Sequence, residues 1–269
     1  SLTQGGKLPP NKIQISDSHV YLPVRKVERV DRKVKLYNLE TSASNYCIPF
    51  IVHNCWENLY GRYNMLERTM IAKTDFVICG SREAEEQINH FNKNTEVMPQ
   101  VGIDTEHFAP LVNAEKEADL IFVGREAEKK GSQIIQKGVL ERTNYKLLEV
   151  IGQPYERMPA MYNKARVLVQ PVLDMPYWKD QWLSFAIAEA LSCGLRAVGS
   201  STRAYVEQGK DIPYFYIARM GSPEAFNRAV VDALTDWKTN LEGRQYIIDH
   251  YGYEAMSKRL MDVFERVLK

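Results

Sequence analysis

The chain has 269 residues, of which 45% are hydrophobic and 26% are charged, and its formal net charge at pH 7 is +1. This length accommodates one large domain or two smaller ones, and the composition is that of an ordinary globular protein. A net charge so close to zero argues against a chain whose main partner is nucleic acid or a membrane surface. The charge is uneven, because residues 1–54 carry eight Lys or Arg and four Asp or Glu, a net charge of +4 that leaves −3 for residues 55–269.

The four cysteines argue against two common cysteine-based architectures. Cys47, Cys55, Cys79 and Cys193 form no C-x-x-C pair, so the sequence predicts neither a disulfide framework nor a zinc site. No apolar run is long enough to span a bilayer, and no signal peptide is recognisable. The first residue is Ser rather than Met, which favours a processed or cloned chain. We therefore expect a cytoplasmic protein with no metal, no cofactor and no membrane span.

The first 54 residues have the pattern of short β-strands. Residues 1–20 contain Gly-Gly and Pro-Pro without periodicity, which is typical of a linker. Between residues 21 and 39 apolar side chains alternate with charged ones, and residues 45–52 end in a second apolar run. An all-β element of this size is too small to bury a core by itself, so residues 21–54 are expected to need a partner.

After Cys55 the pattern changes to strands that alternate with amphipathic helices. Helices are expected at 56–73, 82–91, 132–140, 156–165, 181–194, 222–237 and 252–269, with Ser81 capping the second. Strands are expected at 75–81, 96–101, 119–124, 146–152, 165–172, 196–201 and 214–218. This alternation predicts an α/β fold with a Rossmann-like, doubly wound parallel sheet. A Rossmann dehydrogenase is disfavoured, because no G-x-G-x-x-G follows the first strand.

The segment KVKLYNLETSASNYCIPFIVHNC, residues 33–55, resembles the two C-terminal blocks of inteins. The resemblance implies a small all-β Hint-type fold for residues 1–54 and a protein-splicing reaction at Asn54–Cys55. The Cys55 thiol is a nucleophile that can accept an acyl group as a thioester. The Asn54 side chain can cyclise to a succinimide and break the following peptide bond, while the His53 imidazole polarises the carbonyl or moves the proton. The alternative is a chance triplet: a surface His, a turn Asn and a free Cys.

Two positions depart from the intein pattern. Asn38 stands where these blocks usually have Asp, and no His occurs near Ser44–Asn45. Cys47 is one candidate to assist the reaction, although a small apolar strand residue is the simpler interpretation. The resemblance covers only the C-terminal blocks, so the splicing partner would be an N-terminal intein fragment. Because residues 1–54 have a net charge of +4, an acidic partner is favoured, since opposite charges steer association.

From Trp56 onward the chain resembles the retaining GT-B glycosyltransferases, a family that includes enzymes like sucrose-phosphate and glycogen synthases. Four motifs carry the resemblance through their order and spacing. They are a crossing helix and strand that end in CGS at Ser81, MPQVGIDTEHFAP at 98–110, LIFVGREAEKKG at 120–131, and AEALSCG at 188–194. The resemblance implies a nucleotide-sugar donor as substrate. It also implies that the acceptor-binding domain precedes this sequence, so the isolated chain should not transfer sugar.

The same resemblance implies a set of donor-binding residues. Arg125 and Lys130 match the pair that neutralises the leaving diphosphate, and Glu189 matches the second acid of the family's E-x7-E motif, which binds the ribose. Gln181 stands at the position of the first acid, and Asp180 is one residue further from Glu189. This irregularity puts the sugar contacts in doubt. For each of these residues, a solvated surface position is the structural alternative.

Four further residues are weaker candidates. Arg203 ends the segment 199–203, which the resemblance places in a loop near the phosphates, and Gly102 should permit a close backbone approach in the cleft. Tyr155 and Met158 border the nucleobase or simply pack in the core, and the sequence does not distinguish these. Cys79 and Cys193 are expected to be packing residues.

The predicted organisation has three segments. Residues 1–54 are the intein C-terminal segment, with a linker at 1–20 and a β segment at 21–54. Residues 55–104 end the glycosyltransferase N-terminal domain and form its hinge, and residues 105–269 bind the nucleotide-sugar. Two alternatives stay open: a nucleotide-binding module without transferase activity, and an N-terminal β extension with a purely structural role.

Overall fold

The computed structural model describes residues 65–99, 102–124, 131–173 and 183–267, together with the backbone of six short strands between residues 14 and 53. The chain forms two compact units. The first comprises residues 1–78 and 88–96, and the second comprises residues 79–87 and 97–269. The predicted segment boundaries at 54 and 104 concern function rather than compactness, and they stay predictions.

The six N-terminal strands form antiparallel pairs. β1 (Gln14–Ile15) pairs with β2 (Val20–Tyr21), β3 (Val24–Arg29) with β4 (Tyr37–Thr41), and β5 (Asn45–Ile48) with β6 (Phe50–His53). Within residues 21–54 the described segments are thus strands, as expected, whereas the Hint-type fold stays a prediction. The prediction of an uninterrupted linker over residues 1–20 is wrong at β1, where the short alternation Ile13-Gln14-Ile15 already favours a strand.

β6 also joins a four-stranded sheet of order β5-β6-β7-β8, in which it pairs in parallel with β7 (Phe76–Cys79). β8 (Thr95–Val97) completes this sheet, and α1 (Met65–Lys73) precedes β7. In the first unit the Asn92 amide donates to the Ile71 and Thr74 carbonyls at 2.9 and 2.6 Å, which ties the segment after α2 (Arg82–Ile88) to the end of α1.

The second unit is built on a five-stranded sheet of order β10-β9-β11-β12-β13, and every pair of neighbouring strands is parallel. The predicted Rossmann-like parallel sheet is thus confirmed. The strands are short: β9 (Leu120–Val123), β10 (Leu147–Val150), β11 (Val167–Gln170), β12 (Arg196–Ser200) and β13 (Phe215–Ala218).

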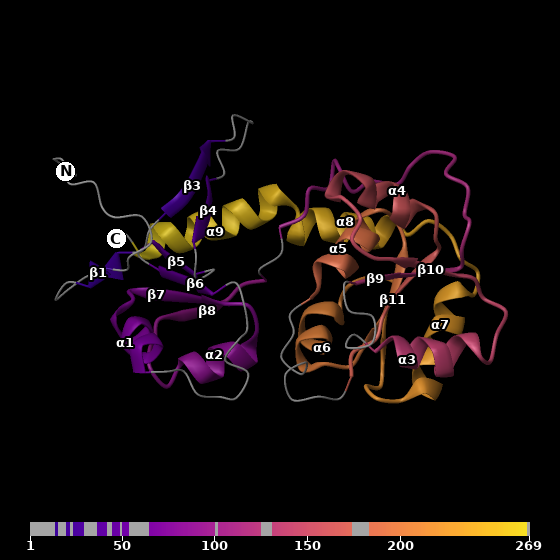
Figure 1. Cartoon of the computed structure of the whole chain (residues 1–269), viewed down its shortest axis with the longest axis horizontal. Coiled ribbons are helices and arrows are strands. Elements are labelled where there is room, and N and C mark those ends of the chain that lie inside the picture. Colours follow the sequence, from indigo (N-terminus) through magenta and orange to yellow (C-terminus); the bar gives the residue numbers. More distant parts are fainter. Residues whose placement is uncertain are drawn as a thin grey trace. The chain divides into compact units, whose positions relative to one another are not determined.

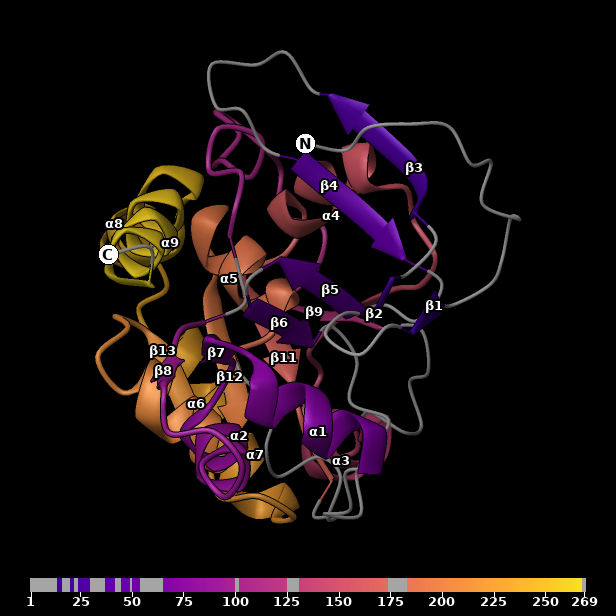
Figure 2. The ribbon, with the colours of Figure 1, turned by 90° about the vertical axis from the view of Figure 1, so that its left-hand side faces the viewer.

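Helices cover both faces of this sheet, as Figures 1 and 2 show. Along β9, Leu120 and Phe122 belong to the core beneath α3 (Ser132–Ile135) and α7 (Pro223–Leu234). Ile121 points to the opposite core, formed with α4 (Met158–Asn163), α5 (Phe185–Ser192) and α8 (Leu241–Tyr251). Leu120, Ile121 and Phe122 are all fully buried, as expected for a parallel strand that is covered on both faces.

Two helices of the second unit were not predicted, α6 (Arg203–Gly209) and α8. Each begins at a buried capping residue: Thr202 Oγ1 accepts from the Tyr205 N–H at 3.1 Å, and Asn240 Oδ1 accepts from the Gly243 N–H at 2.7 Å. Such caps satisfy amide groups that a helix start leaves free. The apolar face of α6 is short, and α8 has a glycine near its start, so neither segment shows a clear helical periodicity of apolar residues in the sequence.

Other element boundaries also differ from the predictions. The helix expected at 181–194 begins only at Phe185, because Ser184 caps it by accepting from the Ile187 N–H at 3.3 Å. The helix expected at 132–140 continues from α3 as a π-helical turn, Gln136–Leu140. Ser81 caps α2 as expected, through a 3.2 Å hydrogen bond from the Ala84 N–H. The terminal helix is α9 (Tyr253–Val267). None of the described helices is long and apolar enough to cross a membrane.

Candidate functional site

The carboxyl ends of the five parallel strands meet at one edge of the sheet in the second unit. β9 lies between β10, the next strand along the chain, and β11, so the winding direction reverses between β9 and β11. Ligands of doubly wound sheets bind at such a reversal, outside the carboxyl ends of the strands. The residues that follow these two strands, Gly124 and Pro171–Leu173, therefore mark the candidate site.

A second glycine, Gly131, lies at the same edge of the sheet. Gly131 has a left-handed backbone with φ of +80°, and a Cβ atom there would lie 3.5 Å from the side chains of Pro171 and Leu173. Gly124 and Gly131 flank residues 125–130, the segment that carries the predicted diphosphate-binding cations. Arg125 and Lys130 themselves lie outside the described residues, so their roles stay predictions.

Glu189 is the predicted site residue whose surroundings the structure describes in most detail. It lies half-buried on α5, the helix that follows β11, and its Oε2 accepts a 2.7 Å hydrogen bond from the Tyr162 hydroxyl of α4. Burial raises the pKa of this carboxyl, while the Tyr162 hydrogen bond and the nearby His107 lower it. Among the described residues, no group donates a hydrogen bond to Oε1, which leaves that oxygen as an acceptor for hydroxyl groups.

An aromatic cluster lies beside this carboxylate. The rings of His107 and Tyr155 stack with centroids 4.8 Å apart, and Phe108 meets both rings edge-on. His107 Nε2 is 3.2 Å from the Tyr155 carbonyl oxygen, and Asp104 Oδ1 accepts from the His107 N–H at 3.0 Å. Tyr155 is 48% exposed, so its ring is available to a planar ligand. His107 was missed by the sequence reasoning, although it lies within the quoted segment 98–110.

Gln170 is a second residue that the sequence reasoning missed. It ends β11 at the reversal, is 4% exposed, and its Oε1 accepts no hydrogen bond within the described part of the chain. An unsatisfied buried acceptor costs about 1–3 kcal/mol. The backbone after it is fixed, because the Val172 N–H donates to Ser200 Oγ at 2.8 Å. The available signal was a polar side chain at the carboxyl end of an otherwise apolar strand.

Gly102 and Met158 pack against other parts of the chain, which favours a structural role for both residues. A Cβ atom at Gly102 would lie 3.2 Å from the ring of Tyr253, so the close approach there is to the chain itself. The backbone at this point is held by hydrogen bonds that Ile103 exchanges with Tyr251 and Tyr253, of 2.8 and 3.1 Å. Met158 is buried in the core cluster around α4, which favours packing over a contact with the nucleobase.

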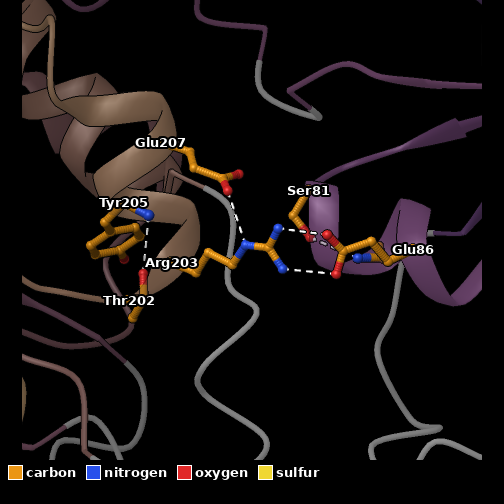
Figure 3. Close-up of polar contacts among 7 residues, drawn as sticks. Ser81, Glu86, Thr202, Arg203, Tyr205 and Glu207 are labelled. Carbon is orange, nitrogen blue, oxygen red and sulfur yellow. Dashed lines mark hydrogen bonds and ion pairs between the residues drawn. The ribbon is translucent and has the colours of Figure 1, made fainter.

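Arg203 is the first residue of α6 rather than part of a loop, which corrects the expectation for residues 199–203. Figure 3 shows its guanidinium group between two carboxylates. Nη1 and Nη2 donate to Glu86 at 2.8 and 2.6 Å, and Nε donates to Glu207 at 2.9 Å. The hydrogen bond from Arg203 holds the pKa of Glu86 below its usual value. Arg203 would have to exchange these partners to bind a phosphate.

The remaining predicted residues are described only in part or not at all. His53 ends β6, and its backbone pairs opposite Asn45. Asn54, Cys55, Asp180 and Gln181 lie outside the described residues. Cys79 and Cys193 are buried free thiols, as expected of packing residues, and burial raises the pKa of Cys79 to about 12.

Comparisons with known proteins place this arrangement in a family. The profile described as glycosyl transferases group 1 matches residues 101–236, half of the chain, and the chain belongs to that family. The matched region contains the whole carboxyl edge described above, including Glu189, Gln170 and the segment 125–130. A search of curated protein sequences gives no match.

Solved glycosyltransferase structures share the fold. A sucrose-phosphate synthase from Thermosynechococcus elongatus is 17% identical with a TM-score of 0.58, over 76% of this chain and 61% of that one. A glycosyltransferase from Rickettsia africae is 11% identical with a TM-score of 0.60, over 81% and 69%. HepE from Anabaena, solved with UDP-glucose, is 10% identical with a TM-score of 0.60, over 75% and 66%. This chain thus spans less than two thirds of the synthase.

Proposed function

We propose that the second unit holds the nucleoside diphosphate end of a nucleotide-sugar, and that the complete protein transfers the sugar with retention of configuration. The observation that carries this proposal is Glu189, a half-buried carboxylate fixed by Tyr162 on the helix that follows the winding reversal. A carboxylate in this state accepts hydrogen bonds from the two ribose hydroxyls. HepE, a structural neighbour, was solved with UDP-glucose, which is consistent with a donor of this class.

The leaving diphosphate needs cations, because negative charge develops on it as the sugar departs. We assign this role to Arg125 and Lys130, which flank the loop after β9, and no metal is required where two cations neutralise the charge. Gln181 or Asp180 would contact the sugar. Arg203 completes the proposed set by exchanging Glu86 for a phosphate oxygen, whereas Gly102, which lies against the Tyr253 ring, has a structural role.

Direct titration of the full chain tests this donor site. UDP, ADP and GDP are each titrated calorimetrically, and one of them is expected to bind with a Kd in the micromolar to millimolar range. Alanine at Arg125 or Lys130 should weaken that binding, whereas R142A, at an exposed arginine paired with Glu224, should not. The chain alone is expected to transfer no sugar. Retention is tested in the completed enzyme by NMR of the anomeric proton of the product.

We further propose that residues 1–54 are the C-terminal half of a split intein, joined to the transferase at Cys55. Support comes from the strands, because β4 contains Tyr37, Asn38 and Leu39 of the intein-like segment 33–55, and β6 ends at His53, immediately before Asn54. In the proposed reaction the Cys55 thiol first captures the upstream acyl group. The Asn54 amide nitrogen then attacks its own carbonyl carbon, which breaks the Asn54–Cys55 bond and frees the Cys55 amine for an S-to-N acyl shift.

Intact-mass spectrometry tests the splicing proposal. The chain is mixed with an acidic N-terminal intein fragment, and its mass should change to that of a product that begins at, or is ligated through, Cys55. The N54A variant should lose this reaction, while N144A, at an exposed asparagine remote in sequence, should retain it. An unchanged mass in the wild-type chain with every fragment would reject the proposal.

The structure also favours a second candidate: a nucleotide-binding module in which residues 1–54 are a structural extension. The pairing of β6 with β7 supplies the four-stranded sheet with a strand, and a Gln stands in place of the first acid. Under this alternative, N54A changes little, the chain binds nucleotide, and the completed protein transfers no sugar.

A further inference from the structure

A hollow of about 750 Å³ lies at the amino ends of β12 and β13 in the second unit. The end of α7 and the start of α8 form its other walls. Because the strands are parallel, this edge of the sheet is opposite the carboxyl edge that carries the proposed donor site. The lining residues that matter for the argument are Arg196, Tyr214, Asp232, Asp236, Lys238 and Glu242.

Backbone strain is concentrated around this hollow. Within the described residues, three non-glycine residues have positive φ, and two of them, Tyr214 at 59° and Asp236 at 47°, line the hollow. A bulky aromatic residue is rare in this conformation, and such strain persists only where the surroundings impose it, frequently at binding sites. The strained backbone leaves the Tyr214 side chain 40% exposed.

A buried arginine holds this strained tyrosine in place. Arg196 is 6% exposed, and it donates to the Ala233, Thr235 and Asp236 carbonyls at 3.1, 2.8 and 3.0 Å. Its guanidinium carbon lies 4.6 Å from the centroid of the Tyr214 ring. The buried Nε has no hydrogen-bond partner within the described residues. The aromatic ring is therefore pre-positioned, with one buried donor beside it left unsatisfied.

The exposed charges select against anionic ligands. Asp232, Asp236 and Glu242 contribute three exposed carboxylates, whereas Lys238 contributes one exposed ammonium group. Carboxylates accept hydrogen bonds from hydroxyl groups, and a tyrosine ring offers an apolar face with a polar edge. This combination suits a neutral, hydroxyl-rich molecule with apolar C–H faces, which describes a sugar chain.

We infer that the hollow binds a neutral oligosaccharide, with Tyr214 packed against a sugar ring and Asp232 and Asp236 accepting its hydroxyls. The choice of a glycan rests on the proposed transferase function, since a growing acceptor or product chain is the glycan that such an enzyme meets. The site would tether that chain on the edge of the sheet opposite the donor site.

The test is a calorimetric titration of the full chain with maltohexaose, cellohexaose and xylohexaose, and with spermidine as a cationic probe. At least one hexasaccharide should bind, and Y214N should weaken its binding at least tenfold. Asn tolerates a left-handed backbone, so this variant removes the ring and preserves the fold. Circular dichroism and an unchanged titration with the nucleoside diphosphate that binds would verify this. D236N should also weaken binding. Y155N, which removes an exposed ring at the opposite edge, should not.

The outcomes separate this inference from the proposed donor site. Binding of UDP, ADP or GDP without any hexasaccharide binding overturns the glycan site alone. Hexasaccharide binding that persists in Y214N and disappears in E189Q also overturns it, because the sugar then occupies the donor site. Spermidine binding that depends on Tyr214, without hexasaccharide binding, overturns the choice of ligand. If a hexasaccharide binds through Tyr214 and no nucleotide binds, the hollow is a glycan site and the donor proposal is rejected.

Discussion

The Tyr162 hydroxyl donates a 2.7 Å hydrogen bond to Glu189 Oε2, and this contact joins α4 to α5 on one face of the parallel sheet. Tyr162 is fully buried, so its hydroxyl has a fixed position. The carboxylate is consequently held in one orientation before any ligand arrives, and its second oxygen stays available. Pre-organisation of this kind lowers the entropic cost of binding.

Replacing Glu189 by Gln should weaken nucleoside diphosphate binding by roughly ten- to a hundredfold. Hydrogen bonds to a charged group contribute about 1.5–3 kcal/mol, and each 1.4 kcal/mol is about tenfold in affinity. Calorimetric titration of both proteins measures the effect. E117Q, which alters an exposed carboxylate before β9 that pairs with Lys164, is the matched control. Equal affinities for E189Q and wild type would remove Glu189 from the site.

The Y162F variant should shift the pH dependence of nucleotide binding. The Tyr162 hydrogen bond lowers the pKa of Glu189, so its removal raises that pKa, and the carboxylate becomes protonated at a higher pH. Affinity in Y162F should then fall off at a higher pH than in the wild-type chain. Y145F, on the opposite face of the sheet, should keep the wild-type profile. A profile unaltered by Y162F would contradict the assigned hydrogen bond.

Stability should also depend on pH through Glu189. Burial raises the pKa of Glu189 above its ordinary value, so the folded state retains this proton at a pH where the unfolded chain has lost it. Stability therefore decreases as pH rises from the ordinary glutamate pKa to the folded pKa, and it is then constant. Urea unfolding across this range should show a smaller decrease for E189Q than for the wild-type chain. A steeper decrease in E189Q would reverse the assigned sign.

Arg244 should be more important for stability than an exposed arginine. Its guanidinium donates to the carbonyls of Phe108, Ser192 and Thr105 at 2.8, 2.6 and 2.9 Å, which ties the segment before β9 to the end of α5. R244M removes the charged donor from all three carbonyls, although the Phe108 carbonyl keeps a 2.6 Å hydrogen bond from the Ser192 hydroxyl. The substitution should cost about 2–3 kcal/mol of unfolding free energy. R142M should cost far less, because Arg142 forms an exposed ion pair with Glu224. Chemical denaturation of both variants measures the difference.

The buried thiols should resist modification in the folded chain. Burial raises the pKa of Cys79 to about 12 and also raises that of Cys193, so almost no thiolate exists at pH 8. Iodoacetamide labelling followed by peptide mass mapping should leave both residues unmodified until urea unfolds the chain. Rapid labelling of either residue in the native chain would show that it is accessible.

The sequence predicted the parts of the fold that depend on local pattern. Every strand of the parallel sheet was anticipated, because apolar runs such as residues 119–124 are bounded by charged or turn residues. The helices α6 and α8 were missed because their starts depend on the buried caps Thr202 and Asn240, whose burial is decided by tertiary packing.

The residues of the candidate site also differ in whether the local sequence pattern indicates them. The half-buried position of Glu189 on α5 could be anticipated, because a charged residue between apolar neighbours on a helix is conspicuous, while its role in binding stays a proposal. His107 and Gln170 could not, because their importance comes from contacts between segments distant in the sequence: stacking on Tyr155 for His107 and the reversal at β11 for Gln170. Arg203 was placed in a loop because nothing local reveals its pairing with Glu86, 117 residues away.

The donor site at the carboxyl edge is tested most directly by calorimetric titration of nucleoside diphosphates into the full chain and into the E189Q variant. At least one of UDP, ADP and GDP should bind at a single site, and E189Q should weaken this binding by tenfold or more. If the folded chain binds none of the three, or if E189Q binds as tightly as the wild-type chain, then the carboxyl edge of the sheet is not the donor site proposed.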